Sequence, residues 1–179
     1  MLDEIQINGK KFRIFIPEKT INEAIDQIAH QMQEDMQGKD PLFIAVLNGS
    51  FMFASELMKR INIPSRISFV RVKSYDGIQS SKNYNELLGL TENIEGKNIV
   101  ILEDIIDSGF TIQNIVRILK EKNPETIKIA TLLFKPEALQ HEVNPDYAAL
   151  SIPNDFIIGY GLDYNEYGRN LKDIYTIVQ

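Results

Sequence analysis

Residues 99–111 read IVILEDIIDSGFT, and this stretch decides the fold that the sequence predicts. Its first four residues are a short apolar run, typical of a strand buried in a parallel sheet, so we expect a strand over residues 98–103. Residues 111–121, TIQNIVRILKE, place apolar side chains at helical spacing until Asn123-Pro124 ends the pattern. The stretch is therefore predicted to run from strand through loop to helix.

Two acidic residues, Glu103 and Asp104, stand where the predicted strand ends. Burial of both carboxylates is not expected, and paired carboxylate oxygens suit Mg²⁺, which binds through one or two carboxylates together with substrate oxygens. The residues that follow, 107–111, bring backbone N–H groups, two hydroxyls and a glycine to a helix N-terminus, where a phosphate binds well. A site for a metal-associated sugar phosphate is predicted, against the alternative of solvated acids beside a simple Ser108 helix cap.

The familiar nucleotide motifs are missing from the sequence. It contains neither GxxxxGK[ST] nor GxGxxG, and the segment GYGLDY at 159–164 lacks the third glycine. The predicted phosphate site is therefore neither a P-loop nor a dinucleotide fold.

Predicted strands and helices alternate along residues 42–134. In order, they are strand 42–47 (LFIAVL), helix 50–60 (SFMFASELMKR), strand 66–72 (RISFVRV), strand 98–103, helix 111–121 and strand 126–134 (TIKIATLLF). This order favours right-handed βαβ units in an α/β fold, with a mostly parallel central sheet flanked by helices. Ligands of such sheets bind at the carboxyl ends of the strands.

Residues on either side of this core predict a smaller unit. Asn8-Gly9 separates two alternating runs and predicts a hairpin with a type I′ turn. The capping-box spacing of residues 20–23 then predicts a helix that ends at Gly38.

Near the other end of the sequence, short strands without intervening helices are predicted at 147–152 (YAALSI), 156–160 (FIIGY) and 173–178 (DIYTIV). We expect these strands and the hairpin to form a small hood on a core of about residues 20–135, within a single domain that spans 1–179.

Composition excludes several classes of function. The net charge of −6 argues against the broad basic surface that nucleic-acid binders need. The absence of cysteine excludes disulfides, thiolate metal sites and cysteine nucleophiles. Apolar runs are too short to span a bilayer and the first residues are charged and alternating, so a soluble cytoplasmic protein without membrane or nucleic-acid partners is expected.

The segment ILEDIIDSGFT, 101–111, closely resembles the phosphoribosyl pyrophosphate (PRPP) signature of the type I phosphoribosyltransferase family. Further segments resemble blocks of its hypoxanthine-guanine branch, in the same order: VLNGSFMFASEL (46–57), FVRVKSY (69–75), LLFKP (132–136) and DFIIGYGLDYNEYGRNL (155–171). The resemblance implies the type I phosphoribosyltransferase fold, with a hood over the base. It also implies Mg²⁺-dependent transfer of phosphoribose from PRPP to a 6-oxopurine, which gives IMP or GMP and pyrophosphate.

The same resemblance assigns residues to the ribose and the 5-phosphate. It implies that Glu103 and Asp104 contact the ribose hydroxyls, directly or through Mg²⁺ and water, and that Asp107 lies near purine N7 as the candidate general base. The 5-phosphate would be held by the consecutive residues Asp107, Ser108, Gly109, Phe110 and Thr111.

On the leaving-group side, Leu47, Asn48 and Gly49 match the family's pyrophosphate loop, which often contains a non-proline cis peptide. Arg169 matches a pyrophosphate-binding arginine. Many members carry lysine or arginine at the position of Asn48, and a larger residue before the arginine where this chain has Gly168. The loop's backbone role is expected to survive these departures.

On the base side, Lys135 matches the lysine that donates to purine O6, which favours hypoxanthine or guanine over adenine. Phe156 matches the residue that stacks on the base, and the backbone of Ile157 would meet the base edge. Asp163, grouped with these purine-side residues, matches the acid that reaches a second Mg²⁺. Ser74 and Tyr75 match the start of a closing lid.

Two alternatives stay open at this level, one a transferase that prefers xanthine or guanine, the other a nonenzymatic regulator that keeps a PRPP pocket as a sensor. The acidic net charge counts against a regulator that binds nucleic acid. Relatives in this family form dimers or tetramers, so a homodimer or homotetramer is expected.

Overall fold

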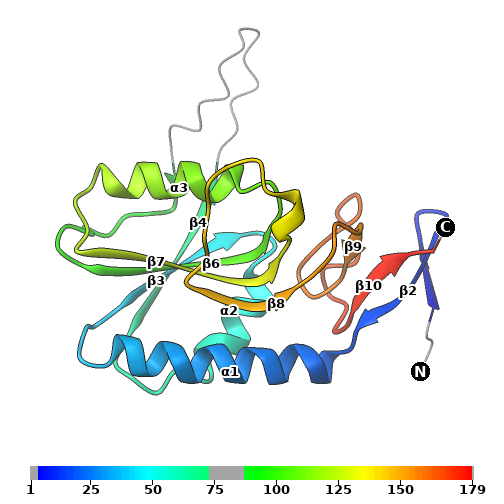
Figure 1. Cartoon of the computed structure of the whole chain (residues 1–179), viewed down its shortest axis with the longest axis horizontal. Helices are drawn as coiled ribbons and strands as arrows, with labels where there is room; N and C mark the ends of the chain where they lie inside the picture. The colour runs from blue at the N-terminus through cyan, green and yellow to red at the C-terminus, as the bar shows by residue number, and fades with distance from the viewer. Residues whose placement is uncertain (1–3, 73–86, 179) are drawn as a thin grey trace, which may run out of the picture.

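A computed structural model of the chain describes residues 4–72 and 87–178 (Figure 1). The elements are β1 (Glu4–Ile7), β2 (Lys10–Ile16), α1 (Glu18–Met36), β3 (Leu42–Leu47), α2 (Phe51–Met58), β4 (Arg66–Val72), β5 (Leu87–Leu88), β6 (Asn98–Ile106), α3 (Phe110–Lys120), β7 (Thr126–Phe134), the 3₁₀ helix η1 (Pro136–Ala138), β8 (Tyr147–Ser151), β9 (Ile157–Ile158) and β10 (Ile174–Ile177). They form one six-stranded and one four-stranded sheet.

The larger sheet has the strand order β5-β4-β3-β6-β7-β8, and all of its pairings are parallel except that of β4 with β5. Helices α1 and α2 cover one face and α3 the other (Figure 1). Apolar runs in β3 and β6 are buried on both faces, which is the pattern of central strands in a parallel sheet. The predicted α/β fold, with a mostly parallel sheet flanked by helices, is confirmed.

The smaller sheet is antiparallel, in the order β1-β2-β10-β9, and joins the two ends of the described chain. The turn between β1 and β2 has φ of 49° at Asn8 and 78° at Gly9, as a type I′ turn requires, so the predicted hairpin is confirmed. Figure 1 shows this sheet on the side toward which β6 runs, beyond the carboxyl edge of the larger sheet.

Helix α1 does not begin at the predicted capping box. It starts at Glu18, after Pro17. The backbone N–H of Glu18 donates to Oδ1 of Asp173, 2.7 Å away, so the helix is capped by a side chain 155 residues further along the chain. The prediction of a local cap at residues 20–23 was wrong because a tertiary contact supplies the acceptor.

Residues 147–152 were also placed wrongly, since β8 is the edge strand of the larger sheet and not part of the hood. It pairs parallel to β7, with Ala130 opposite Tyr147 and Phe134 opposite Ser151. The crossover that a parallel strand needs is made here by a loop with the short helix η1. Because this loop shows no helical periodicity, the sequence pattern did not predict a crossover connection there. The single-domain boundary itself stays a prediction.

Within the described residues, no helix is both long enough and apolar enough to cross a bilayer.

Candidate active site

The signature acids lie inside β6, which continues to Ile106, three residues past the predicted strand end. Glu103 and Asp104 are 7% and 8% exposed, so the expectation that both would not be buried was wrong. For Asp104, the turn at Gly49 packs against the carboxylate, a contact between distant parts of the sequence that the local pattern does not reveal.

The two buried carboxyl groups lie close enough to influence each other's pKa. Burial, followed by the charge of Asp104, raises the pKa of Glu103 well above its ordinary value. Burial also raises the pKa of Asp104, although hydrogen bonds and the charge of Arg169 offset part of that effect. The Oε2 atom of Glu103 has no hydrogen-bond partner among the described residues. The pair therefore retains a proton more strongly than solvated acids do.

Replacing Glu103 with Gln is expected to stabilise the free protein by about 1 kcal/mol at roughly pH 8. In the native state burial raises the pKa of Glu103, so losing its proton costs more there than in the unfolded chain, which ionises near the ordinary value of 4.5. The free energy of unfolding of the wild type therefore falls as the pH rises above 4.5. A glutamine at position 103 cannot ionise, so the variant does not lose this stability.

Urea unfolding of wild type and Glu103→Gln at roughly pH 5 and roughly pH 8 measures this difference. The gain should be larger at the higher pH. Glu125→Gln, an exposed acid before β7, is the matched control and should show no such trend. A gain that is independent of pH would contradict the explanation.

The loop after β6 forms a small cavity of about 210 Å³, which Glu103 and residues 105–112 line. Gly109, with φ of 83°, directly precedes α3, so the backbone turns here into the first helical turn. The carbonyl of Ser108 accepts from the backbone N–H groups of Gln140 and His141, at 3.0 and 3.1 Å. The segment predicted to bind phosphate therefore lines a cavity at a helix N-terminus, the kind of place where backbone N–H groups can bind an anion.

Lys135 and Asp107 meet beside this cavity. The Nζ of Lys135 lies 3.0 Å from Oδ2 of Asp107 and 3.4 Å from Oδ1 of Asn154. Lys135 is only 6% exposed, whereas the Asp107 side chain is half exposed. The backbone N–H of Lys135 donates to the carbonyl of Ile106, which fixes the start of the loop after β7 beside the end of β6.

The turn after β3 contains a cis peptide bond between Leu47 and Asn48, as the resemblance implied. A Cβ on Gly49 would stand 1.6 Å from Oδ2 of Asp104, so only glycine fits against that carboxylate. A Cβ on Gly161 would stand 1.9 Å from the carbonyl oxygen of Gly49. The turn is therefore held between β6 and the segment that contains Asp163 and Arg169.

Arg169 is fixed within that segment, which follows β9. Its Nη1 donates to the carbonyl of Gly161 at 2.9 Å, and its Nη2 forms an ion pair with Oδ1 of Asp163 at 2.5 Å. The other oxygen of Asp163 accepts from the backbone N–H of Glu166 at 2.7 Å. Despite the smaller Gly168, Arg169 lies near enough to influence the pKa of Asp104.

Phe156 is 48% exposed, one of several large aromatic side chains at the surface of the described residues. Its ring meets Tyr164 edge-on at 5.7 Å between centroids, and its neighbour Ile157 is buried in β9. Two residues earlier, Asn154 contacts Lys135, so this segment and Lys135 lie at one site.

The structure thus brings together at the carboxyl edge the residues that the resemblance assigned to the ribose, the 5-phosphate and the pyrophosphate, with Lys135 and Asn154 beside them. Ser74 and Tyr75, predicted as the lid, lie outside the described residues. Across the described part of the chain, no cluster of three His, Cys, Asp or Glu side chains suits a metal on its own.

Two contacts at this site were not predicted from the sequence. One is that of Asn154 with Lys135, which no sequence pattern marks, and the other is that of Arg71 with Asn48.

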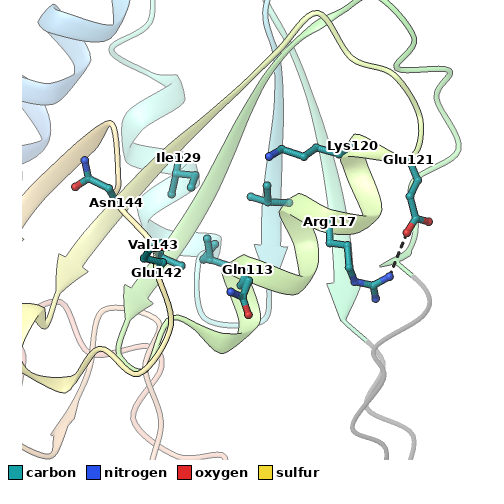
Figure 2. A pocket seen from close by; sticks show the side chains of 10 residues that line it. Gln113, Arg117, Lys120, Glu121, Ile129, Glu142, Val143 and Asn144 are labelled. Carbon is teal, nitrogen blue, oxygen red and sulfur yellow. Dashed lines mark hydrogen bonds and ion pairs between the residues drawn. The ribbon is translucent and has the colours of Figure 1, made fainter.

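A larger cavity of about 620 Å³ lies elsewhere, between α3, β7 and residues 142–144. Figure 2 shows Gln113, Lys120 and Asn144 around it, with Arg117 paired to Glu121 at 3.1 Å. None of the signature acids lines this cavity, so its size does not make it the active site.

Comparison with known proteins agrees with this geometry. The family model described as the phosphoribosyl transferase domain matches residues 17–165. The hypoxanthine-guanine phosphoribosyltransferase of Streptococcus pyogenes serotype M3 is 43% identical over 160 residues, covering 89% of each chain. That of Streptococcus pneumoniae strain R6 is 39% identical over 163 residues, covering 90% of this chain and 91% of the relative.

Among solved structures, a hypoxanthine phosphoribosyltransferase from Staphylococcus aureus superposes with a TM-score of 0.86 at 35% identity. The superposition covers 93% of this chain and 91% of that one.

Proposed function

The chain belongs to the phosphoribosyl transferase family, and we propose that it transfers the 5-phosphoribosyl group of PRPP to N9 of hypoxanthine, and also of guanine, in purine salvage. The contact of Lys135 with Asp107 carries this proposal, because it joins a purine-facing donor to the acid beside the phosphate cavity at 3.0 Å. The products are IMP or GMP and pyrophosphate.

PRPP is held at three places in this proposal. The 5-phosphate enters the cavity at the N-terminus of α3, where residues 107–111 surround it. Glu103 and Asp104 face the ribose hydroxyls from β6. The pyrophosphate lies against the turn at residues 47–49, with Arg169 on its far side.

The base lies between Phe156 and the end of β7. The exposed ring of Phe156 stacks on the purine, and the backbone of Ile157 meets its edge. Lys135 donates to O6, and because an ammonium has three donors it can retain its contact with Asp107. Adenine presents an amine at the same place, so the base offers no acceptor to the donor of Lys135 that O6 would satisfy.

In the proposed reaction, the bond between C1′ and the pyrophosphate oxygen breaks while purine N9 forms a bond to C1′ from the opposite face. In the purine tautomer protonated on N7, the N9 lone pair attacks and Asp107 accepts the N7 proton. The carboxylates of the site stabilise the positive charge that develops on the ribose. Cationic Lys135 holds the Asp107 carboxylate in place during the transfer.

The residues present fit a divalent cation such as Mg²⁺. Glu103 offers a buried oxygen without a hydrogen-bond partner among the described residues, and a cation would offset the cost of burying two adjacent carboxyl groups. Glu103 and Asp104 would hold it with ribose oxygens, and Asp163 would reach a second cation through the pyrophosphate. When bound, Mg²⁺ would neutralise charge on the leaving pyrophosphate.

The test is to incubate the purified protein with PRPP, Mg²⁺ and one base at a time, using hypoxanthine, guanine, xanthine or adenine, and to follow nucleotide formation. We expect turnover with hypoxanthine and guanine. Turnover mainly with xanthine would correct the substrate, and no product from any 6-oxopurine would refute the function. Light scattering of the same sample tests the proposed homodimer or homotetramer.

Replacing Lys135 with Met is expected to raise the KM for hypoxanthine by about 10- to 100-fold, because a hydrogen bond from a charged group to O6 is lost. The KM for PRPP should change much less. Lys128→Met is the matched control, since Lys128 lies within β7, the strand that Lys135 follows, but pairs with Asp146. If both variants have the same KM for hypoxanthine, Lys135 does not bind the base.

A further inference from the structure

Arg71 lies at the carboxyl end of β4, level with Leu47 at the end of β3. Its Nη2 donates to Oδ1 of Asn48 at 2.9 Å, so the guanidinium is attached to the turn that faces the leaving group in the proposed function. The contact itself is exposed to solvent. The arginine therefore stands at the open edge of the site rather than within the core.

The partner of Arg71 is neutral. Within residues 4–72 and 87–178, Arg71 forms no ion pair with a carboxylate, unlike Arg60, Arg66 and Arg169, each of which pairs with an acid. A guanidinium has five N–H donors, and the contact with Asn48 uses one of them. An exposed arginine oriented by an amide oxygen keeps its full charge for an anion.

The charge balance at this end of the sheet explains why such a cation is needed. Asp104 lies against the turn, Asp163 belongs to the segment packed on it, and pyrophosphate is itself strongly anionic. Arg169 approaches from the segment packed on Gly49, but part of its charge is neutralised by Asp163. Asn48 contributes no charge, so Arg71 supplies positive charge on the β4 side.

We propose that Arg71 is a pyrophosphate-binding residue, oriented by Asn48, that provides the cationic charge which the turn at residues 47–49 itself lacks. The inference rests on the proposed function, because it identifies a further group for the leaving-group half of PRPP. In this proposal, the side chain of Asn48 orients the guanidinium of Arg71 toward the turn.

Steady-state kinetics of four proteins test the proposal: wild type, Arg71→Gln, Asn48→Lys and the double variant Arg71→Gln/Asn48→Lys. Arg71→Gln should raise the KM for PRPP about 10- to 100-fold, as expected for a lost charge-assisted contact. The KM for hypoxanthine should stay within about twofold. In the double variant, the introduced lysine is expected to place a cation at the turn again and to recover most of the lost PRPP affinity. If Arg71 had only a structural role, the lysine would not recover this affinity.

Arg66→Gln is the matched control, because Arg66 lies at the opposite end of β4 and pairs with Asp40 at 2.7 Å. Urea unfolding of each variant confirms that the fold is retained. An Arg71→Gln variant that matches Arg66→Gln in its KM for PRPP overturns the inference, and so does a double variant no better than Arg71→Gln.

Calorimetric titration of pyrophosphate with Mg²⁺ separates this inference from the proposed function. Wild type should bind pyrophosphate, and Arg71→Gln should bind it about 10- to 100-fold more weakly. If wild type makes no nucleotide but this difference remains, the proposed function fails and the binding role of Arg71 stands. Equal affinity in the two proteins, or no binding by wild type, overturns the role of Arg71.

Discussion

Replacing Asp107 with Asn is expected to lower kcat by about 100- to 10,000-fold, the usual range for loss of a general base. The amide can still accept from Lys135, so the geometry beside the phosphate cavity should persist. It cannot take the purine N7 proton, which affects the transition state much more than the ground state. The KM for PRPP should therefore change by less than about threefold.

Pre-steady-state and steady-state assays with hypoxanthine, together with PRPP binding by calorimetry, measure the two effects separately. Glu125→Gln removes one carboxylate at the opposite edge of the sheet and should leave both parameters unchanged. Similar losses in turnover and in PRPP affinity for Asp107→Asn would mean that Asp107 holds the substrate and does not act as the base.

Replacing Gly161 with Ala is expected to destabilise the protein by about 3 kcal/mol or more and to abolish most of the activity. The new Cβ would meet the carbonyl oxygen of Gly49 at 1.9 Å, and backbone on both sides leaves no flexible side chain to move away. The φ of 100° at Gly161 adds its own cost for any residue with a side chain. Relief of the clash requires the turn at residues 47–49 to shift away from Arg169.

Gly38→Ala separates these two costs. Gly38 also has a positive φ, 73°, but a Cβ there would meet nothing within 4 Å. Its variant should lose only about 1–2 kcal/mol and keep full activity. Urea unfolding and PRPP kinetics of both variants give the comparison, and equal losses in stability would show that backbone conformation alone explains the effect at Gly161.

The sequence predicted the central elements well because their signals are local. Residues 42–47, 66–72 and 126–134 are strands with the predicted bounds, since short apolar or alternating runs have few other ways to bury their side chains. The same holds for the hairpin at Asn8-Gly9, where the turn residues determine the backbone conformation. The signature at 101–111 predicted the order of strand, loop and helix in the same way, because these elements are consecutive in the sequence.

Features that depend on distant parts of the chain could not be predicted. Asp104 is buried with the turn at Gly49, far away in sequence, packed against its carboxylate. Asn154 reaches Lys135 through the arrangement of a loop after β8, and no residue pattern marks that contact. Arg71 shows only strand alternation in the sequence, and its role depends on the parallel register of β3 with β4.

The contact between Glu18 and Asp173 has a consequence for how the chain is made. During synthesis, residues 18–36 leave the ribosome long before Asp173 exists, and β2 likewise waits for its partner strand β10. The four-stranded sheet and the cap of α1 can therefore be completed only after residues 173–177 have been translated. The strands of the larger sheet, residues 42–151, are all translated before residue 173, so this sheet can form first. The N-terminal segment is thus translated first but completes its contacts last.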